Sequence, residues 1–295
     1  MRGTIAMNLW SRFLFGMLML LIAAVRPALG GQGLIYGIYS DDGPRGYLVG
    51  TMHSEDPRVV SLLGQLVPLI EQVDVVAIEM VPDAVALIAV GAATLLPADR
   101  DLRGLIGEER FESLVAAAAP LGLPRDMLDR LKPWAAAMAL GMPRPESGRF
   151  LDMEIYLQAL QLQRPVVGLE TAAEQLAVFE QMDPGLQLVL LDAMVKNAPY
   201  MPKQLEELTQ AYLLGDLDQI DEVARSQYED IPPALLRWFD GLLLHSRNVR
   251  MLESLSPLLD GGTALIAVGA MHLAGDTGLV AGLRRRGYRV EPWRG

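Results

Sequence analysis

The stretch Tyr47-Leu48-Val49-Gly50-Thr51-Met52-His53 recurs in outline near the other end of the chain as Val268-Gly269-Ala270-Met271-His272. Each copy has a glycine and, three residues later, a histidine, and each follows an apolar run that is typical of a buried strand. His53 and His272 are two of the three histidines in the chain. Because neutral imidazole binds metal ions and transfers protons near neutral pH, these two strand ends are the first candidates for chemistry.

The composition is that of a folded, acidic protein. The 295 residues are 51% hydrophobic and carry a formal charge of -11, from 25 basic and 36 acidic side chains. A chain of this length can bury a large core. It has no lysine- or arginine-rich block that could neutralise a run of phosphates, so we expect no nucleic-acid partner. The lack of cysteine excludes disulfides, thiolate metal sites and a cysteine nucleophile.

The first thirty residues have the pattern of an export signal. Arg2 and Arg12 precede an apolar stretch over 13–25, and Ala28 and Gly30 are small residues at the positions that a signal peptidase reads. This stretch is shorter than the roughly 17 to 25 residues that a spanning helix needs. We therefore predict a signal peptide over residues 1–30 and a periplasmic or secreted bacterial protein. An uncleaved inner-membrane anchor is the alternative, and this segment is the only membrane contact that we expect.

Strand patterns occur near the start of the mature chain and again around residue 165. Apolar runs over 34–40 and 46–50, on either side of the turn signal Asp41-Asp42-Gly43-Pro44, predict a hairpin. A continuously apolar, β-branched run over 73–78 predicts a strand that is buried on both faces. Another short run over 165–169 predicts a further strand.

The rest of the chain has a mainly helical pattern from residue 82 to about 260. Its last unit is expected to contain a strand over 264–268, a helix over 276–286 and a closing strand over 288–292. Strands separated by helical segments indicate an α/β fold. We predict one domain over 31–295, with a mostly parallel central sheet whose terminal strands can be antiparallel, and with a large helical insertion.

Four of the predicted strands end in side chains that suit a catalytic or metal site: His53, Glu79, Glu170 and His272. In a mostly parallel sheet the carboxyl ends of the strands share one edge, where α/β proteins bind their ligands. Two imidazoles and two carboxylates that converge there would suit Mn, Co, Fe or Zn. Since a metal ion acidifies a bound water into a nucleophile at neutral pH, hydrolysis is the natural reaction class.

Each of these side chains also has a structural interpretation. A lone histidine after a strand is more often a hydrogen-bonded structural residue than a ligand, and it is the repeated four-residue frame that favours function. Glu79 could instead face water or cap the next helix. Glu170 precedes the capping-box pattern of Thr171 and Glu174, where a helix dipole stabilises any carboxylate. His245 has no glycine context and is expected to be an ordinary helix residue.

Further segments match a known pattern in order and spacing. They are Ala77-Ile78-Glu79, Lys132-Pro133-Trp134, Val167-Gly168-Leu169-Glu170-Thr171 with Glu174-Gln175, Arg247-Asn248 with Met251, and Leu273 with Gly275, Gly278, Leu279 and Gly287-Tyr288. Together with the two G-x-x-H segments they resemble the TraB/PrgY/GumN family over about residues 34–293. That family more distantly resembles the Tiki metalloproteases and the erythromycin esterases. The resemblance implies a shared α/β core with both G-x-x-H histidines and a strand-end glutamate at the site.

The Tiki branch of this resemblance implies divalent-metal-dependent peptide cleavage, with Mn or Co. Carried over to this chain, it makes His53, Glu79 and His272 the metal ligands, with Glu79 alternatively the general base. Glu170 and the Arg247-Asn248 pair are the next catalytic candidates. An arginine at position 247 could stabilise an oxyanion as it develops, although a salt-bridge role is the structural alternative.

We therefore predict a metal-dependent hydrolase that acts on a peptide or a small molecule, with Mn or Co as the favoured ion and Zn or Fe as alternatives. Met52 and Met271, at the third motif position, offer a metal no hard ligand, so such a site would depend on the histidines and acids. Two other functions stay open. One is a metal-free hydrolase in which a histidine activates water directly, and the other is a non-catalytic binding or regulatory protein linked to surface polysaccharide or signalling peptides.

Overall fold

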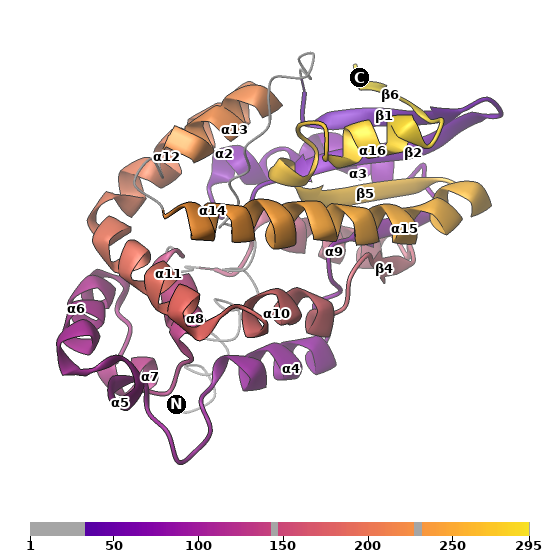
Figure 1. Cartoon of the computed structure of the whole chain (residues 1–295). Helices are drawn as coiled ribbons and strands as arrows, with labels where there is room; N and C mark the ends of the chain where they lie inside the picture. Colours follow the sequence, from indigo (N-terminus) through magenta and orange to yellow (C-terminus); the bar gives the residue numbers. More distant parts are fainter. Residues whose placement is uncertain (1–32, 143–146, 227–231, 295) are drawn as a thin grey trace.

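The computed structural model describes residues 33–142, 147–226 and 232–294, so the predicted signal peptide over residues 1–30 lies outside them. Within these ranges no helix combines the length and the apolar character that a membrane crossing requires. A central sheet lies between layers of helices (Figure 1). Its strands are β1 (Ile35–Ser40), β2 (Gly43–Thr51), β3 (Val75–Ile78), β4 (Val166–Gly168), β5 (Ala264–Gly269) and β6 (Arg289–Pro292).

The sheet has the strand order β4-β3-β5-β2-β1-β6. Strands β4, β3, β5 and β2 are mutually parallel, whereas β1 runs antiparallel to both of its neighbours. Thr51 pairs with Gly269, and Ile78 pairs with both Gly168 and Ala267, so the four parallel strands end nearly level with one another. This arrangement confirms the predicted α/β fold with a mostly parallel sheet, and β1 and β2 confirm the predicted hairpin.

Both faces of the sheet are covered by helices, which explains why every residue of β5 is buried. In Figure 1, α15 (Ser246–Gly261) and α16 (Leu279–Arg285) lie in front of the strands, and α3 (Leu63–Ile70) and α9 (Leu151–Gln161) lie behind them. The apolar side chains of these helices and of the sheet form one hydrophobic core. The pairing of β2 with β5 also requires a glycine: Gly46 has φ +125°, and a Cβ there would lie 1.8 Å from the carbonyl oxygen of Ala264.

The helical middle of the chain packs around a second core. Its centre contains the rings of Trp134, Phe179 and Trp238. The ring centroid of Phe179 lies 5.1 Å from that of Trp134 and 5.4 Å from that of Trp238. The helices that contribute to this core are α4 (Ala84–Thr94), α5 (Leu102–Ile106), α6 (Glu108–Ala118), α7 (Arg125–Leu128), α8 (Pro133–Leu140), α10 (Ala172–Glu180), α11 (Pro184–Asn197), α14 (Pro233–Trp238) and the π-helical η3 (Phe239–His245). Met271 packs against both cores, so the second G-x-x-H segment lies at their junction.

The remaining helical elements are α2 (Pro57–Val60), α12 (Met201–Leu214), α13 (Leu217–Ser226) and the short 3-10 turns η1 (Ala119–Leu121), η2 (Ala198–Tyr200) and η4 (Ala270–His272). Between β2 and β3 the chain forms two helices, α2 and α3, in a segment weakened by Gly64 and Pro68, which are poor helix formers. One helix boundary differs from the sequence prediction. The last helix begins only at Leu279, because Gly275 adopts φ +71° in a turn before it.

Candidate functional site

Glu79 lies directly after β3, and hydrogen bonds fix both of its carboxylate oxygens. Oε1 accepts from the backbone N–H of Gly269 at 2.7 Å, and Oε2 accepts from Nη2 of Arg247 at 2.6 Å. Only 8% of the Glu79 side chain is exposed. The carboxylate is therefore held in one orientation at the shared edge of β3 and β5.

A buried charge network continues from Glu79 toward β4. Arg247, in the first turn of α15, also donates from Nε to Oε2 of Glu170 at 2.7 Å, and Arg250 donates to Oε1 of Glu170 at 2.9 Å. Burial alone would lower the pKa of the Arg247 guanidinium, but the charges and hydrogen bonds of Glu79 and Glu170 more than offset it and hold the pKa above its usual value. The helix α15 is thus joined to the ends of two strands by charge-assisted hydrogen bonds.

His272, at the end of η4, is fully buried and has a defined tautomer. Its Nδ1 lies 2.6 Å from Oδ1 of Asn248, whose Nδ2 donates to the carbonyl oxygen of Thr277 at 2.9 Å. Because the amide nitrogen of Asn248 is used by Thr277, its oxygen faces the ring and Nδ1 of His272 carries the proton. Nε2 is then a bare lone pair, 3.8 Å from Oε1 of Glu79 and without a hydrogen-bond partner among the described residues. Burial, and then the charge of Arg247, lower the pKa of His272 to about 3, so the ring is neutral.

His53, just beyond β2, lies beside an aspartate. Its Nδ1 lies 3.3 Å from Oδ2 of Asp152, in the first turn of α9, and the Thr51 hydroxyl donates to the other oxygen of that carboxylate. The imidazole also packs on the ring of Phe150, with centroids 3.8 Å apart. Thr51, inside the first G-x-x-H segment, therefore holds the carboxylate that lies beside the histidine of the same segment.

The two G-x-x-H segments pack directly against each other. Gly50 is paired with Val268 in the sheet, and a Cβ on Gly50 would lie 3.1 Å from Cα of Ala270. This is tighter than ordinary van der Waals contact, so an alanine there would displace the second segment. Glycine at this position allows the close approach of one motif to the other rather than a sharp turn.

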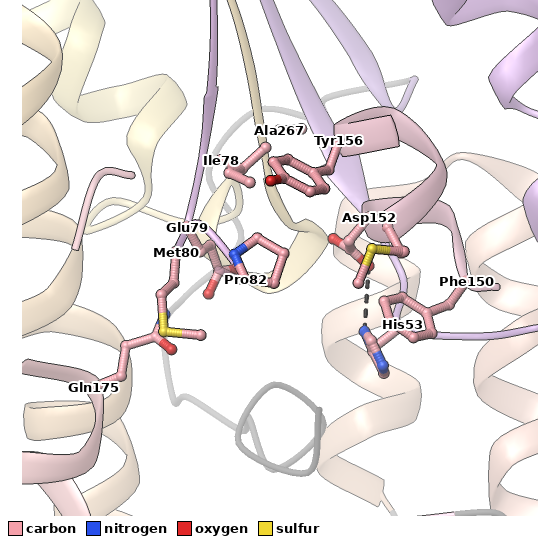
Figure 2. Close-up of a pocket in the computed structure, with 11 residues that line it drawn as sticks. His53, Ile78, Glu79, Met80, Pro82, Phe150, Asp152, Tyr156, Gln175 and Ala267 are labelled. Carbon is pink, nitrogen blue, oxygen red and sulfur yellow. Dashed lines mark ion pairs between the residues drawn. The ribbon is translucent and has the colours of Figure 1, made fainter. Parts of the chain in front are cut away.

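A cavity of about 60 Å³ lies between His53 and Glu79, which is room for a few water molecules or for the reacting group of a substrate. Figure 2 shows His53 and Asp152 on one side of this cavity and Glu79, Met80 and Gln175 on the other. The complete lining is His53, Ile78, Glu79, Met80, Pro82, Phe150, Asp152, Met153, Tyr156, Gln175 and Ala267. Most of the lining is apolar, and Asp152, Met153 and Tyr156 are half-buried, so they lie toward the surface.

The residues that the sequence singled out lie around Glu79. Arg247 contacts Glu79 and joins it to Glu170, as described above. His272 lies 3.8 Å from Glu79, and Asn248 holds His272. His53 faces the same cavity as Glu79 from the far side. His245 lies at the end of η3 with an exposed side chain and has no part in this arrangement.

The three residues predicted as metal ligands fit an ion in part. Oε1 of Glu79 and Nε2 of His272, 3.8 Å apart, could share an ion, since two ligands that each lie about 2.1 Å from a metal are at most about 4.2 Å apart. However, within residues 33–142, 147–226 and 232–294 no three histidine, aspartate or glutamate side chains are grouped as a metal site would require. The metal site therefore stays a prediction.

Two residues of the cavity were missed by the sequence reasoning as site residues: Asp152 and Gln175. Asp152 comes at the start of a helix after the glycine- and proline-rich segment 141–148, and that position is the only sequence signal for it. Gln175 belongs to a family-like segment, but nothing in its pattern shows that the side chain lines a cavity. Both residues lie on helices. The spacing of apolar residues in a helix shows which of its faces is buried, but it does not show which other part of the protein packs against that face.

Comparison with protein-family models matches residues 38–292 to the TraB/PrgY/gumN family. Comparisons with curated proteins and with solved structures found no match. The matched range contains both G-x-x-H segments, both strand-end glutamates and the Arg247-Asn248 pair. Since the match extends over most of the chain and agrees with the resemblance seen in the sequence, this protein belongs to the TraB/PrgY/gumN family.

Proposed function

We propose that this protein is a hydrolase that cleaves an amide or ester in the cavity between His53 and Glu79. One observation carries the proposal: an imidazole from the end of β2 and a carboxylate from the end of β3 line a single cavity across β5. Hydrolysis of a carbonyl compound needs a group that removes a proton from water and charged or polar groups that orient the reactants. The cavity has both kinds of group within a mainly apolar lining.

In this proposal His53 is the general base. The Asp152 carboxylate beside Nδ1 favours the tautomer that carries its proton on Nδ1, which makes Nε2 the nitrogen that accepts a proton from water. Asp152 also stabilises the imidazolium that forms. The proton then passes from His53 to the leaving amine or alcohol, so the base is restored at the end of each turnover.

Glu79 orients the attacking water. Each of its oxygens already accepts one hydrogen bond, from Gly269 or from Arg247, but a carboxylate oxygen has a second lone pair that can accept a hydrogen bond from water. Arg247 holds the carboxylate in place. In the proposed reaction Arg247 is therefore a positioning residue and does not touch the substrate.

The test is an assay of the purified protein against a panel of fluorogenic peptides and p-nitrophenyl acyl esters. We expect His53→Gln and Glu79→Gln to lower kcat/KM at least about 100-fold, the usual range for loss of a proton-transfer group. His245→Gln, which changes an exposed histidine outside the site, should keep full activity. Inactivity of the wild type on the whole panel would contradict the proposal. If Glu79→Gln also fully restored function to a deletion strain, a non-catalytic role would be indicated.

The bare Nε2 of His272 near Glu79 favours a second candidate, a metal-dependent hydrolase with His53, Glu79 and His272 as ligands. A bound Mn, Co, Zn or Fe ion would lower the pKa of a water molecule. Elemental analysis of protein purified without added metal, with His53→Ala and His272→Ala for comparison, tests this candidate. Activity that survives exhaustive chelation selects the His53 base, and activity that is lost and then restored by Mn or Co selects the metal.

A further inference from the structure

The side chain of Gln175 belongs to the cavity lining and carries a buried hydrogen-bond donor that has no partner among the described residues. The residue is only 3% exposed and lines the cavity, and its Nε2 has no hydrogen-bond partner within the part of the chain that the structure describes. Buried polar groups are almost always hydrogen-bonded, because an unmade bond in the interior costs stability. An unpaired buried donor on a side chain that belongs to a cavity lining is therefore an indication of a ligand with an acceptor atom.

The local structure explains why this side chain is fixed there. Helix α10 begins just after Glu170, and the Thr171 and Glu174 side chains form the capping box that the sequence predicts, each bonding to the backbone of the other residue. Glu174 is thereby used at the helix start, and the next residue, Gln175, lies on the side of α10 that faces the cavity. Figure 2 shows its amide beside Met80, on the same side as Glu79.

The other polar side chains of the cavity do not replace this donor. The Glu79 and Asp152 carboxylates are acceptors, and His53 has the role of the base. When water adds to a carbonyl group, negative charge develops on the carbonyl oxygen and is stabilised by donors that are already in place. Apart from His53, the only other neutral donor among the lining side chains is the Tyr156 hydroxyl, and it comes from the opposite element, α9.

We propose that Nε2 of Gln175 donates a hydrogen bond to the carbonyl oxygen of the substrate, an amide or ester with an apolar group next to the carbonyl. The apolar group would contact the Ile78, Met80 and Met153 side chains of the lining. The water oxygen bonds to the carbonyl carbon, the carbonyl π pair moves onto the oxygen held by Gln175, and the water proton goes to His53. The intermediate then expels the amine or alcohol, which takes that proton. This role rests on the proposed hydrolase function.

The kinetic test uses two substitutions of Gln175. Gln175→Met keeps the length of the side chain but removes the donor, and Gln175→Glu keeps its shape but replaces the donor by an acceptor. We expect both to lower kcat about 100- to 1000-fold, the effect of losing one oxyanion donor, with KM changed only a few-fold. Gln181→Met, at the exposed end of the same helix, should match the wild type.

Thermal unfolding separates this role from a structural one. If Gln175 binds only substrate, Gln175→Met removes an unpaired buried donor, so its Tm should equal or exceed that of the wild type. A lower Tm together with unchanged kcat would overturn the proposal. Tyr156→Phe tests the other donor: if it lowers kcat while Gln175→Met does not, the carbonyl oxygen is bound by Tyr156 and the proposal is wrong.

A binding experiment keeps the proposal testable if the wild type hydrolyses nothing. The side-chain amide signals of Gln175 in the ¹⁵N-labelled full chain are assigned by their absence from Gln175→Met. Titration with N-acetyl-leucinamide, an amide with an apolar side chain, should shift these signals and leave those of Gln181 unchanged. Inactivity with this shift would reject the hydrolase but keep the carbonyl-binding site, and inactivity without the shift would reject both.

Discussion

Nη2 of Arg247 lies 2.6 Å from Oε2 of Glu79, and the two side chains are 0% and 8% exposed. The contact joins α15 to the end of β3, and its two residues are 168 positions apart in the sequence. Each charge at this depth is compensated by its partner, so the pair both positions the Glu79 carboxylate and makes the protein sensitive to the loss of either side chain.

Arg247→Met should destabilise the protein by about 3–5 kcal/mol, because it leaves the Glu79 and Glu170 carboxylates buried without their main counter-charge. The free energy of unfolding in urea measures this change. Arg110→Met is the matched control: it breaks an ion pair with Asp192 in which the side chains are 37% and 50% exposed, and it should cost less than about 1 kcal/mol. Equal losses for the two variants would show that the buried network contributes no more than a surface pair.

Asp152→Asn should lower kcat about 100- to 10,000-fold with little change in Tm, since it alters the orientation and tautomer of His53 while the Asp152 side chain is already 23% exposed. Thr51→Val, which removes the hydroxyl that holds Asp152, should have a smaller effect in the same direction. Steady-state kinetics and thermal unfolding on the same samples measure kcat and Tm separately. If the metal-dependent candidate is correct, metal affinity should instead fall about 10- to 100-fold in Asp152→Asn.

The stability of the wild type should fall as the pH decreases below about 6.5. His272 has a native pKa of about 3, whereas an unfolded histidine titrates near pH 6.5, so between these values the unfolded state binds the additional proton. Above pH 6.5 the ring is neutral in both states and has no effect. The expected contribution is roughly 1 kcal/mol per pH unit of acidification. The free energy of unfolding, measured in urea from pH 7 to pH 4, should depend less steeply on pH in His272→Leu than in the wild type. In His245→Gln, at an exposed site, its dependence on pH should match that of the wild type.

Gly50→Ala should destabilise the protein by about 1–3 kcal/mol, because its Cβ would press on Ala270 of the second G-x-x-H segment. The same displacement moves His272, so activity should fall as well. Gly64→Ala is a control that should stabilise the protein. A Cβ at this position has no atom within 4 Å, and alanine is favoured over glycine in helix α3 by about 0.5–1 kcal/mol. Urea unfolding and the hydrolysis assay measure the two effects. Full stability in Gly50→Ala would mean that the two segments tolerate a wider separation.

The sequence was sufficient to predict the strands and the polar residues that follow them, because buried parallel strands are short apolar runs and a polar residue directly after one must lie at the carboxyl edge. It was not sufficient to predict the strand order. Nothing local in Ala264–Gly269 shows that this late segment lies between two early strands, since that depends on contacts across the whole chain. Asp152 and Gln175 were missed for a related reason: their roles arise from the way α9 and α10 pack against the sheet edge.

The place of β5 between β2 and β3 also determines when the site can exist during protein synthesis. His53 and Glu79 follow strands β2 and β3, which are joined in the sheet only through β5, so a nascent chain that lacks the segment from Ala264 onward has neither the complete sheet nor the complete cavity lining. A fragment that ends before this segment would leave the edges of β2 and β3 that face β5 unpaired, and unpaired strand edges are prone to aggregation. The ribosome must therefore synthesise the segment from Ala264 onward before the two sides of the cavity can meet.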